Sequence, residues 1–548
     1  MAEPPAKRRR LQDMEEENGE SSRTPASLTR AISPPYQKNQ SPASRPILLP
    51  SPFRLTTIKG LPPDSNADTV SLSDLLGDPL IAECWEFNYL HDIDFLMARL
   101  DEDVRSLVKM HLIHGFWKRE DPNRLFLEGQ AKQYANVSLH TAYMPEMFGT
   151  HHSKMLILFR HDDTAQIIIH TANMIAKDWT NMTNGVWRSP LLPLNRHHDQ
   201  GNPNIAKIGS GTKFKHDLLS YLQAYNTRRD VCKSLVNKLE KYDFSAVRAA
   251  LIASVPGRHD VEQPEGTTLW GWQALKQSIT SVPIQPGKPE IVVQVSSIAT
   301  LGGTDAWLQQ TLFNSLSCPP TSSFNKSHLS SWPSKPDFKI VFPTADEIRR
   351  SIEGYASGGS IHTRTQSAQQ AKQLQYLRPI FCHWANDSEN GKPVPQIPAP
   401  KNGRRKRAAP HIKTYIRYNA NQSIDWALLT SANISKQAWG EATSKAGDVR
   451  VASWEIGVLV WPALLMDDSD ATMVGVFGTD VPTREDVPRR LGDGAASEED
   501  QPHKQVKVVG LRIPYSLPLQ RYGDDEIPWV ATSVYNEPDW KGNTWPGY

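Results

Sequence analysis

Short apolar runs bounded by turn residues recur along the chain from about residue 66 onward. Met155–Phe159 and Ile167–Ile169 are two such runs, and their length and aliphatic character predict buried strands. His216–Leu239 instead carries its apolar residues at helical spacing. Because strands alternate with helices, the pattern favours α/β layers. At roughly 150 residues per domain, a chain of 548 residues has room for three or four units.

Three stretches lack this apolar pattern. Residues 1–65 hold eleven prolines together with Ser, Arg and Glu, and we expect a disordered tail there. Residues 387–409 and 483–501 are polar and poor in large apolar residues, and we expect flexible insertions. The remaining chain is expected to form an N-terminal domain over residues 66–258 and a C-terminal domain over residues 259–548.

The tail carries two further features. The basic run Lys7–Arg10 is typical of a nuclear-localisation signal, but a solvated charge run has the same composition. Three Ser-Pro dipeptides are candidate phosphorylation sites, at Ser33, Ser41 and Ser51.

One internal repeat stands out. The first copy reads GTHHSKMLILF and then QIIIHTANMIAKDW, and the second reads APHIKTYIRY and then WALLTSANISKQAW. Each copy has His-x-Lys, two strands, and then Ala-Asn followed six residues later by Trp. Lys154 precedes Asn173 by 19 residues, and Lys413 precedes Asn433 by 20. A separation of about 260 residues between the copies predicts two domains of similar architecture, not a solenoid of small units.

The spacing brings the repeated side chains onto one face. Side chains at positions i and i+2 of a strand point to the same side of a sheet, so each His projects together with its Lys. Each Asn follows a neighbouring strand and precedes a helix. If the domains pack about a pseudo-twofold axis, six side chains converge on one pocket at their interface. They are His152, Lys154, Asn173, His411, Lys413 and Asn433.

This set of side chains suits displacement at a phosphodiester. Lysine ammonium groups and asparagine amides donate to the non-bridging oxygens of one phosphate. Two imidazoles on opposite sides suit in-line displacement, in which one attacks phosphorus while the other protonates the leaving oxygen and later activates water. The two copies are too alike to tell which histidine attacks. Because the lysines neutralise the phosphoryl charge, we expect no metal and no other cofactor.

Other histidines and the cysteines give weaker signals. His151 and the His197–His198 pair lack carboxylate or cysteine partners at zinc-site spacing, so we interpret them as ordinary residues. The cysteines are at neither zinc nor redox spacing, which favours a reduced compartment. They are Cys84, Cys232, Cys318 and Cys382. No apolar run approaches the 18 or more residues of a membrane span, so we expect no membrane partner.

The charge balance limits how a nucleic acid could be bound. Lys and Arg total 61 against 59 Asp and Glu, for a net charge of +2. Residues 1–60 carry a surplus of four positive charges, so the other 488 residues have a net charge of −2. This balance argues against a protein that coats duplex nucleic acid by bulk charge. It leaves room for a small, local anion site.

The repeat resembles the motif of the phospholipase D superfamily, H-x-K-x4-D with a downstream Asn, except that Phe159 and Tyr418 stand at the Asp positions. In this departure the chain is similar to one branch, the tyrosyl-DNA phosphodiesterases. Further phrases that resemble this branch run in order from about residue 52 to the C-terminus. They are FNY around Tyr89, FGTHHSK around His152, HTANMIAKDW around Asn173, PGR at Pro256–Arg258, QVSS at Gln294–Ser297, EGYASGGS ending at Ser360, PHIKTY around His411, TSANISKQAWG around Asn433 and WEIGVL at Glu455.

The resemblance implies two similar phospholipase-D-like domains, each a mixed sheet flanked by helices, with the active site between them. It also implies a DNA-repair enzyme that hydrolyses the bond between a DNA 3′ phosphate and a tyrosine of a stalled type IB topoisomerase, or another 3′ adduct, and leaves a 3′-phosphate. The implied partners are DNA 3′ ends and the tyrosyl peptide. A monomer in the nucleus is expected.

The resemblance also assigns roles. His152 becomes the nucleophile that forms a phosphohistidine, and His411 protonates the leaving tyrosine and then activates water. The lysines and asparagines of both copies hold the phosphate oxygens, and Glu455 orients His411. Asn184 stands where we expect Gln in animal relatives, and its shorter side chain puts a supporting role near the nucleophile or the hydrolytic water in question.

Several residues are candidates for DNA contact. Phe148, four residues before His152, and Tyr89 could stack on terminal bases, at about 1–3 kcal/mol per base. Core packing is the alternative for Phe148. Hydroxyl groups in Gly/Ser-rich loops could bind backbone phosphates, and the candidates are Ser296, Ser297 and Ser360. The basic run Arg404–Arg407 could contact DNA, act as a second import signal or be a solvated loop.

Two other functions compete with this interpretation. A lipid phosphodiesterase of the wider superfamily is disfavoured by the missing Asp and by the lack of a membrane-binding segment. A catalytically inactive scaffold that binds DNA ends is disfavoured by the two intact His-Lys-Asn sets.

Overall fold

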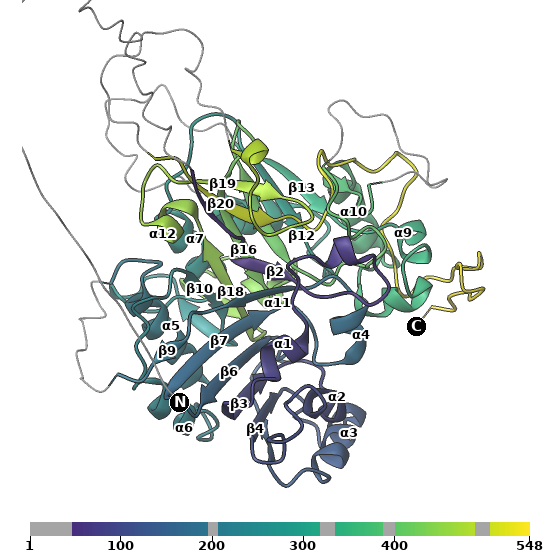
Figure 1. The fold of residues 1–548 in the computed structure, drawn as a ribbon. Helices are drawn as coiled ribbons and strands as arrows, with labels where there is room; N and C mark the ends of the chain where they lie inside the picture. The colour runs from purple at the N-terminus through teal and green to yellow at the C-terminus, as the bar shows by residue number, and fades with distance from the viewer. Residues whose placement is uncertain (1–45, 196–205, 318–334, 387–400, 488–504, 548) are drawn as a thin grey trace, which may run out of the picture.

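The computed structural model describes residues 46–195, 206–317, 335–386, 401–487 and 505–547. Two large sheets and a two-stranded ribbon form the framework, with helices packed around them (Figure 1). The α/β class and the mixed sheets expected from the sequence are confirmed.

The N-terminal sheet contains parallel and antiparallel pairs. The β3–β4 and β4–β5 pairs are parallel, and the other neighbours are antiparallel. A short strand, β9 (Leu192–Pro193), pairs with β7 beside them. In spatial order the strands are β2 (Phe53–Leu55), β8 (Gly185–Arg188), β7 (Thr164–His170), β6 (Met155–Arg160), β3 (Ile81–Phe87), β4 (Lys109–His114) and β5 (Val137–Thr141).

The C-terminal sheet repeats this order and these strand directions. Its β12–β13 and β13–β14 pairs are parallel, and the other pairs in the repeated part are antiparallel. The corresponding strands are β10 (Ala250–Ser254), β18 (Glu455–Val460), β16 (Ile424–Thr430), β15 (Thr414–Tyr418), β12 (Glu290–Gln294), β13 (Asp337–Val341) and β14 (Phe381–Cys382). The sequence repeat is therefore the visible part of a repeated fold, and we refer to the parts built on the two sheets as the N-terminal and C-terminal halves.

Additional strands extend the C-terminal half. β19 (Thr472–Val476) pairs with β16, and β20 (Lys507–Arg512) and β1 (Ile47–Leu49) follow in parallel. A separate ribbon joins β11 (Gly257–Asp260) to β17 (Asp448–Val451).

Alternating side chains of the central strands fill apolar layers on both faces. In β6, Met155 and Ile157 enter the core shared by both sheets, whereas Leu156 and Leu158 pack against the helices of the opposite face. The two runs predicted as buried strands lie in β6 and β7, so these predictions are confirmed.

Helices cover both sides of the N-terminal sheet (Figure 1). The helical spacing found over His216–Leu239 corresponds to α5 (Gly211–Ala224) and α6 (Lys233–Leu239), whose apolar faces join the shared core. On the other side lie α1 (Leu72–Leu76), α2 (Ile93–Met97) and α3 (Pro122–Ala131). The shared core holds the two sheets in a fixed relation, which the site requires.

The boundary of the predicted tail is wrong. Strand β1 pairs with β20 and strand β2 pairs with β8, so the segment from residue 46 onward is built into both halves. Ser51 lies between these strands, buried, and its hydroxyl donates to the Phe53 carbonyl. Strands of three residues among prolines have too little apolar pattern to be detected. Residues 1–45, with Ser33, Ser41 and the basic run Lys7–Arg10, lie outside the described residues.

The predicted domain boundary at residue 258 is also misplaced. Strand β10 precedes it in the chain, but it pairs with β18 and belongs to the C-terminal sheet. Its partner begins about 200 residues later, and no local pattern indicates such a pairing.

Part of the predicted insertion at 387–409 is ordered. Lys401 forms a bridge with Leu517, and the fully buried Arg405 donates to the Thr56 carbonyl at 3.0 Å. The run Arg404–Arg407 is therefore only partly exposed, because Arg404 faces solvent whereas the guanidinium group of Arg405 fastens the C-terminal half to the segment after β2. Residues 387–400, and 488–501 of the second predicted insertion, lie outside the described residues.

Three of the cysteines are free and buried: Cys84, Cys232 and Cys382. Cys318 lies outside the described residues. Among the residues that the structure describes, no helix has the length and apolar character needed to cross a membrane.

Candidate active site

The repeated motifs occupy equivalent places in the two halves. His152 and Lys154 lie directly before β6, and His411 and Lys413 lie directly before β15. They were predicted within the strands, but the extended segment ahead of each strand carries them instead. Asn173 and Asn433 follow β7 and β16 and precede α4 (Ala176–Thr180) and α11 (Lys436–Trp439), as predicted.

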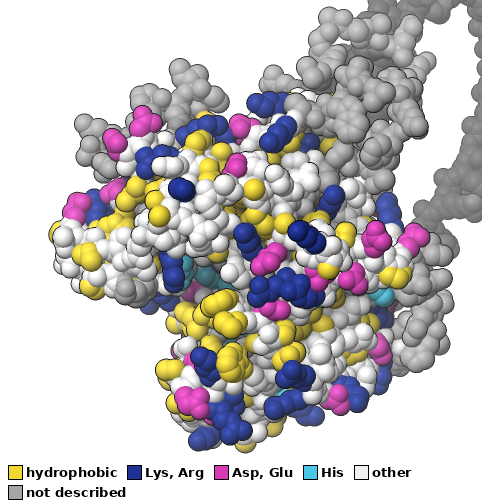
Figure 2. Space-filling view, turned by 180° about the vertical axis from the view of Figure 1, so that it is seen from behind, with side chains coloured by type: hydrophobic (Ala, Val, Ile, Leu, Met, Phe, Trp, Pro, Cys, Tyr) yellow, Lys and Arg dark blue, Asp and Glu magenta, His cyan; other side chains and the backbone are white. Residues whose placement is uncertain are grey.

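Side chains of both halves line one open pocket of about 390 Å³. The pocket contains ten of the side chains singled out in the sequence: His152, His411, Asn173, Asn433, Glu455, Phe148, Tyr89, Ser296, Ser297 and Ser360. Lys154, Lys413 and Asn184 are fully buried. Figure 2 shows histidine side chains inside a hollow of the surface with hydrophobic side chains along its border. Of the six repeated side chains, the two histidines and the two asparagines line this pocket.

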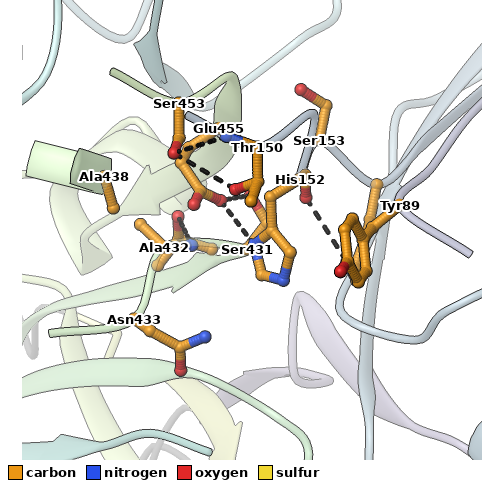
Figure 3. Close-up of polar contacts among 12 residues, drawn as sticks. Tyr89, Thr150, His152, Ser153, Ser431, Ala432, Asn433, Ala438, Ser453 and Glu455 are labelled. Atoms are coloured by element: carbon orange, nitrogen blue, oxygen red, sulfur yellow. Dashed lines mark hydrogen bonds and ion pairs between the residues drawn. The ribbon is translucent and has the colours of Figure 1, made fainter. Parts of the chain in front are cut away.

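Glu455 holds the imidazole of His152. Its Oε2 lies 2.9 Å from Nδ1 of His152 and also accepts a hydrogen bond from the Ser431 hydroxyl (Figure 3). The Ile456 amide donates to that hydroxyl at 3.0 Å. A carboxylate on Nδ1 fixes the proton there and leaves the lone pair of Nε2 available for the pocket.

Asn184 holds His411 in the equivalent way. Its Oδ1 lies 3.1 Å from Nδ1 of His411 and accepts from the Thr171 hydroxyl at 2.8 Å. The Gly185 amide donates to that hydroxyl at 3.0 Å. The shorter side chain therefore still reaches its histidine.

This arrangement corrects the role expected for Glu455, which binds His152 and not His411. The strand order explains why each histidine is bound by the opposite half. β8 and β18 are equivalent strands, so Asn184 and Glu455 occupy equivalent positions, and each lies opposite the motif of the other half. Each histidine is consequently held by a side chain from the half to which it does not belong.

Backbone hydrogen bonds between the two halves also hold each histidine in place. The His152 amide donates to the Trp454 carbonyl at 3.0 Å, one residue before Glu455. The His411 amide donates to the Thr183 carbonyl at 3.0 Å, one residue before Asn184. The return bonds run from Trp454 to the Thr150 carbonyl at 2.9 Å and from Thr183 to the Ala409 carbonyl at 2.9 Å. Main chain and side chain together set the position of both rings.

The two lysines are buried close to each other. Burial lowers the pKa of Lys154 to about 8, although the carboxylates of Glu455 and Asp178 oppose the shift. Burial lowers the pKa of Lys413 well below its ordinary value, and the charge of Lys154 adds to this effect. Their ammonium groups donate to the carbonyls of the motif histidines, Lys154 to that of His152 and Lys413 to that of His411. A bound anion would relieve their mutual repulsion.

The same burial lowers the pKa of both histidines. It lowers the pKa of His152 to about 4 despite the attraction of Glu455, with Lys154 adding to the decrease. The pKa of His411 also falls well below its ordinary value, through burial first and then through Lys413 and Lys154. A neutral imidazole with Nε2 unprotonated is the form that can attack phosphorus.

The two asparagines are held by different groups. Oδ1 of Asn433 accepts from the amides of Ser296 at 3.1 Å and Ser297 at 2.9 Å. Asn173 instead donates from its amide nitrogen to Asp178 at 2.9 Å. Both side chains line the pocket in fixed orientations.

The aromatic candidates lie at the mouth of the pocket. Phe148 is 72% exposed, so the alternative of core packing is wrong. Tyr89 is partly exposed, and its ring centroid lies 6.0 Å from that of His152. Ser360 reaches the pocket at the end of η5 (Gly354–Ser360).

His151 is an ordinary structural residue, as predicted. Its Nδ1 lies 2.8 Å from the Asn88 carbonyl and its Nε2 lies 3.0 Å from the Tyr225 hydroxyl, which occupies both ring nitrogens. His197 and His198 lie outside the described residues. Within the described part of the chain, no cluster of three or more His, Cys, Asp or Glu residues is arranged to hold a metal ion.

Sequence reasoning missed Thr171, Ser431 and Asp178. Thr171 and Ser431 stand in the phrases TAN and SAN, two residues before each repeated Asn, so the aligned copies contained a signal for them. Asp178 has no carboxylate counterpart in the second copy, so the repeat did not indicate it.

Two sheets of like topology, with a His-Lys-Asn set from each, define a phospholipase-D-like phosphodiesterase. The sequence model of the tyrosyl-DNA phosphodiesterase family matches residues 52–523, and the chain belongs to this family of phosphodiester hydrolases.

Individual relatives agree. A probable tyrosyl-DNA phosphodiesterase of Schizosaccharomyces pombe is 28% identical, with 93% of this chain and 98% of the relative aligned. Tyrosyl-DNA phosphodiesterase 1 of Arabidopsis thaliana is 30% identical over 91% of this chain and 77% of its own length. The crystal structure of the yeast tyrosyl-DNA phosphodiesterase has a similar fold, with a TM-score of 0.57 and 19% identity over 87% of this chain and 98% of that chain.

Proposed function

We propose that this enzyme hydrolyses the bond between a DNA 3′ phosphate and tyrosine, and so removes topoisomerase-derived peptides and other 3′ adducts during DNA repair. The observation that carries the proposal is the pair of crosswise-held histidines beside two buried lysines, in a member of this family. Family membership disfavours the lipid phosphodiesterase and the inactive scaffold.

The first step is displacement of tyrosine. Nε2 of His152 attacks phosphorus, the bond from phosphorus to the tyrosine oxygen breaks, and His411 gives that oxygen a proton. Glu455, 2.9 Å from Nδ1, stabilises the positive charge that develops on His152. The phosphate charge is balanced by Lys154 and Lys413, so the step needs no metal.

The second step returns the enzyme to its starting state. Neutral His411 takes a proton from water, the hydroxide attacks phosphorus, and the bond from phosphorus to His152 breaks. The product is a 3′-phosphate, and His411 again carries the proton for the next leaving group. Asn173 and Asn433 hold non-bridging phosphate oxygens through both steps.

The DNA strand is proposed to enter over the exposed aromatic rings. Phe148 and Tyr89 provide stacking surfaces for terminal bases, and the hydroxyls of Ser296, Ser297 and Ser360 bind backbone phosphates. We further propose that the enzyme acts as a monomer in the nucleus, with Lys7–Arg10 as the import signal. A fluorescent reporter fused to residues 1–45 should enter the nucleus, and replacing the four basic residues by Ala should abolish entry.

The histidine roles are tested with a 3′-phosphotyrosyl oligonucleotide in excess chelator. Wild-type enzyme should release tyrosine under these conditions. His152→Ala should abolish covalent capture of DNA, because the attacking nitrogen is lost. His411→Ala should slow both steps by about 10²–10⁴-fold and let the protein–DNA adduct accumulate from a substrate with an activated leaving group.

Two results would contradict the mechanism. Turnover of the wild type only with added metal would exclude charge balance by the lysines alone. Equal capture of DNA by both histidine variants would mean that the two roles are wrongly assigned.

A further inference from the structure

Asp178 is a fully buried carboxylate that the mechanism above does not use. Its Oδ2 accepts from the backbone amide of Asn173 at 2.8 Å and from the side-chain amide at 2.9 Å. The same oxygen lies 3.2 Å from Nδ1 of His411. One carboxylate therefore touches a phosphate-holding side chain and the acid–base histidine.

The second copy of the repeat lacks this carboxylate. Asp178 stands five residues after Asn173 and directly before a Trp, and Ala438 stands at the same place after Asn433. Ala438, on α11, presents only a methyl group (Figure 3). The two half-sites therefore differ at this position by one negative charge.

The strand register shows a second difference of the opposite sign. His170 pairs with Val186, and the equivalent residue Thr430 pairs with Gly457. Asn184 and Glu455 each stand two residues before these pairs and are therefore equivalent. Glu455 supplies the carboxylate near Nδ1 of His152, where the position equivalent to Asp178 is Ala438. At His411 the equivalent of Glu455 is the uncharged Asn184, and Asp178 supplies the carboxylate near Nδ1.

The charges around Asp178 make its carboxylate important to His411. Burial raises the pKa of Asp178, while the hydrogen bond from Asn173 and the charges of Lys413, Lys154 and Lys177 oppose the rise. Lys413 and Lys154 also lower the pKa of His411. A carboxylate 3.2 Å from Nδ1 offsets these lysines and favours protonated imidazole. His411 needs that proton to release a tyrosine.

We propose that Asp178 is a positioning residue of the reaction: it supplies the negative charge that Asn184 lacks at His411. This inference rests on the proposed function, because it concerns how His411 obtains and delivers a proton.

The test compares two leaving groups in the first turnover at saturating DNA. Asp178→Asn should slow release of tyrosine by about 10–100-fold, because a pKa decrease of one or two units reduces the protonated fraction of His411 by that factor. Release of 4-nitrophenol should change less than about threefold, because this leaving group departs without a proton. The alkaline limb of the tyrosine reaction should move to lower pH by one to two units.

Asp425→Asn is the matched control. Asp425 is a buried carboxylate that pairs with Arg417 at 2.9 Å and lies at the start of β16, away from the pocket. Its loss should lower the melting temperature without altering the leaving-group dependence or the pH profile. Asp178→Ser has a smaller uncharged side chain and serves the same comparison if Asp178→Asn does not fold.

Each outcome has a definite meaning. If wild-type enzyme releases no tyrosine, the proposed function fails. If wild-type enzyme is active and the Asp178 variants lose equal rate on both leaving groups with an unmoved pH profile, Asp178 is only structural and this inference fails. A loss confined to tyrosine, with the shifted limb, supports it.

Discussion

At the residue scale, the active site depends on side chains that act on others. Glu455 and Asn184 do not need to touch the phosphate, yet they set which nitrogen of each imidazole faces it. Burial lowers the pKa of both rings, and the charges of Lys154 and Lys413 add to the decrease. The rate should therefore follow the titration of a few buried groups.

The pH dependence of DNA capture follows from these charges. With a 4-nitrophenyl ester, which needs no proton from His411, kcat/KM should be level between about pH 5 and pH 7. It should fall as pH drops toward about 4, because His152 becomes protonated and cannot attack. It should also fall as pH rises through about 8, because Lys154 loses the charge that binds phosphate. An acid limb centred near the ordinary histidine pKa of about 6.5 would contradict this account.

Much of the pocket could be predicted from the sequence, but the partners of the histidines could not. A motif that occurs twice identified the side chains that converge, because equivalent positions of a repeated fold meet at one interface. The partner of each histidine depends on which strand lies across that interface. The sequence therefore does not show that Glu455 binds His152 and not His411. It also gives no signal for Asp178, because the equivalent residue of the second copy is Ala438.

At the element scale, long strands were predictable and short or distant ones were not. β6 and β7 each contain an uninterrupted aliphatic run, which can be recognised from the sequence of that segment alone. β1 and β2 have three residues each and are recognised only by their partners β20 and β8. Local pattern predicts what an element is, and long-range pairing decides where it belongs.

A buried ion cluster joins three of the C-terminal elements. Nε2 of His383, just after β14, lies 2.8 Å from Glu526, and its Nδ1 lies 3.4 Å from Glu347 in α9 (Ala345–Arg349). Burial lowers the pKa of His383, but hydrogen bonds and attraction to the two carboxylates outweigh burial and raise it to about 9.

This cluster should make stability depend on pH. A group whose pKa is raised by folding stabilises fully below its unfolded value of about 6.5 and loses that contribution as pH rises through about 9. The free energy of unfolding should therefore fall between pH 6.5 and pH 9, by on the order of 1–3 kcal/mol. Urea denaturation of wild type and His383→Gln measures this, and the difference between them should shrink with rising pH. A constant difference would show that His383 contributes by packing alone.

At the scale of the whole molecule, the charge distribution limits how the proposed DNA substrate could be bound. The net charge of +2 is spread over 548 residues, while two buried lysines lie beside one pocket. The proposed recognition of a DNA strand end by this pocket, with aromatic stacking alongside, would neutralise few phosphates.

The salt dependence of catalysis should therefore be shallow. A plot of log kcat/KM against log salt concentration should have a slope no steeper than about −1.4 on a single-stranded substrate, since each of the two lysines contributes at most about −0.7. The matched measurement uses Phe148→Ala, which should lower kcat/KM without changing the slope, because stacking carries no charge. A slope steeper than about −6 would indicate an extended basic track.

The crossed arrangement of the histidines also bears on how such a site can change over time. The two halves carry equivalent motifs, yet each motif is completed by residues of the opposite half, through Glu455 and Trp454 on one side and Asn184 and Thr183 on the other. Neither copy can drift independently, since a substitution in one alters chemistry begun by the other. The two halves differ in where they carry a carboxylate: Glu455 is equivalent to Asn184, and Asp178 is equivalent to Ala438. A change in one half can therefore be tolerated only if the other half still completes the site.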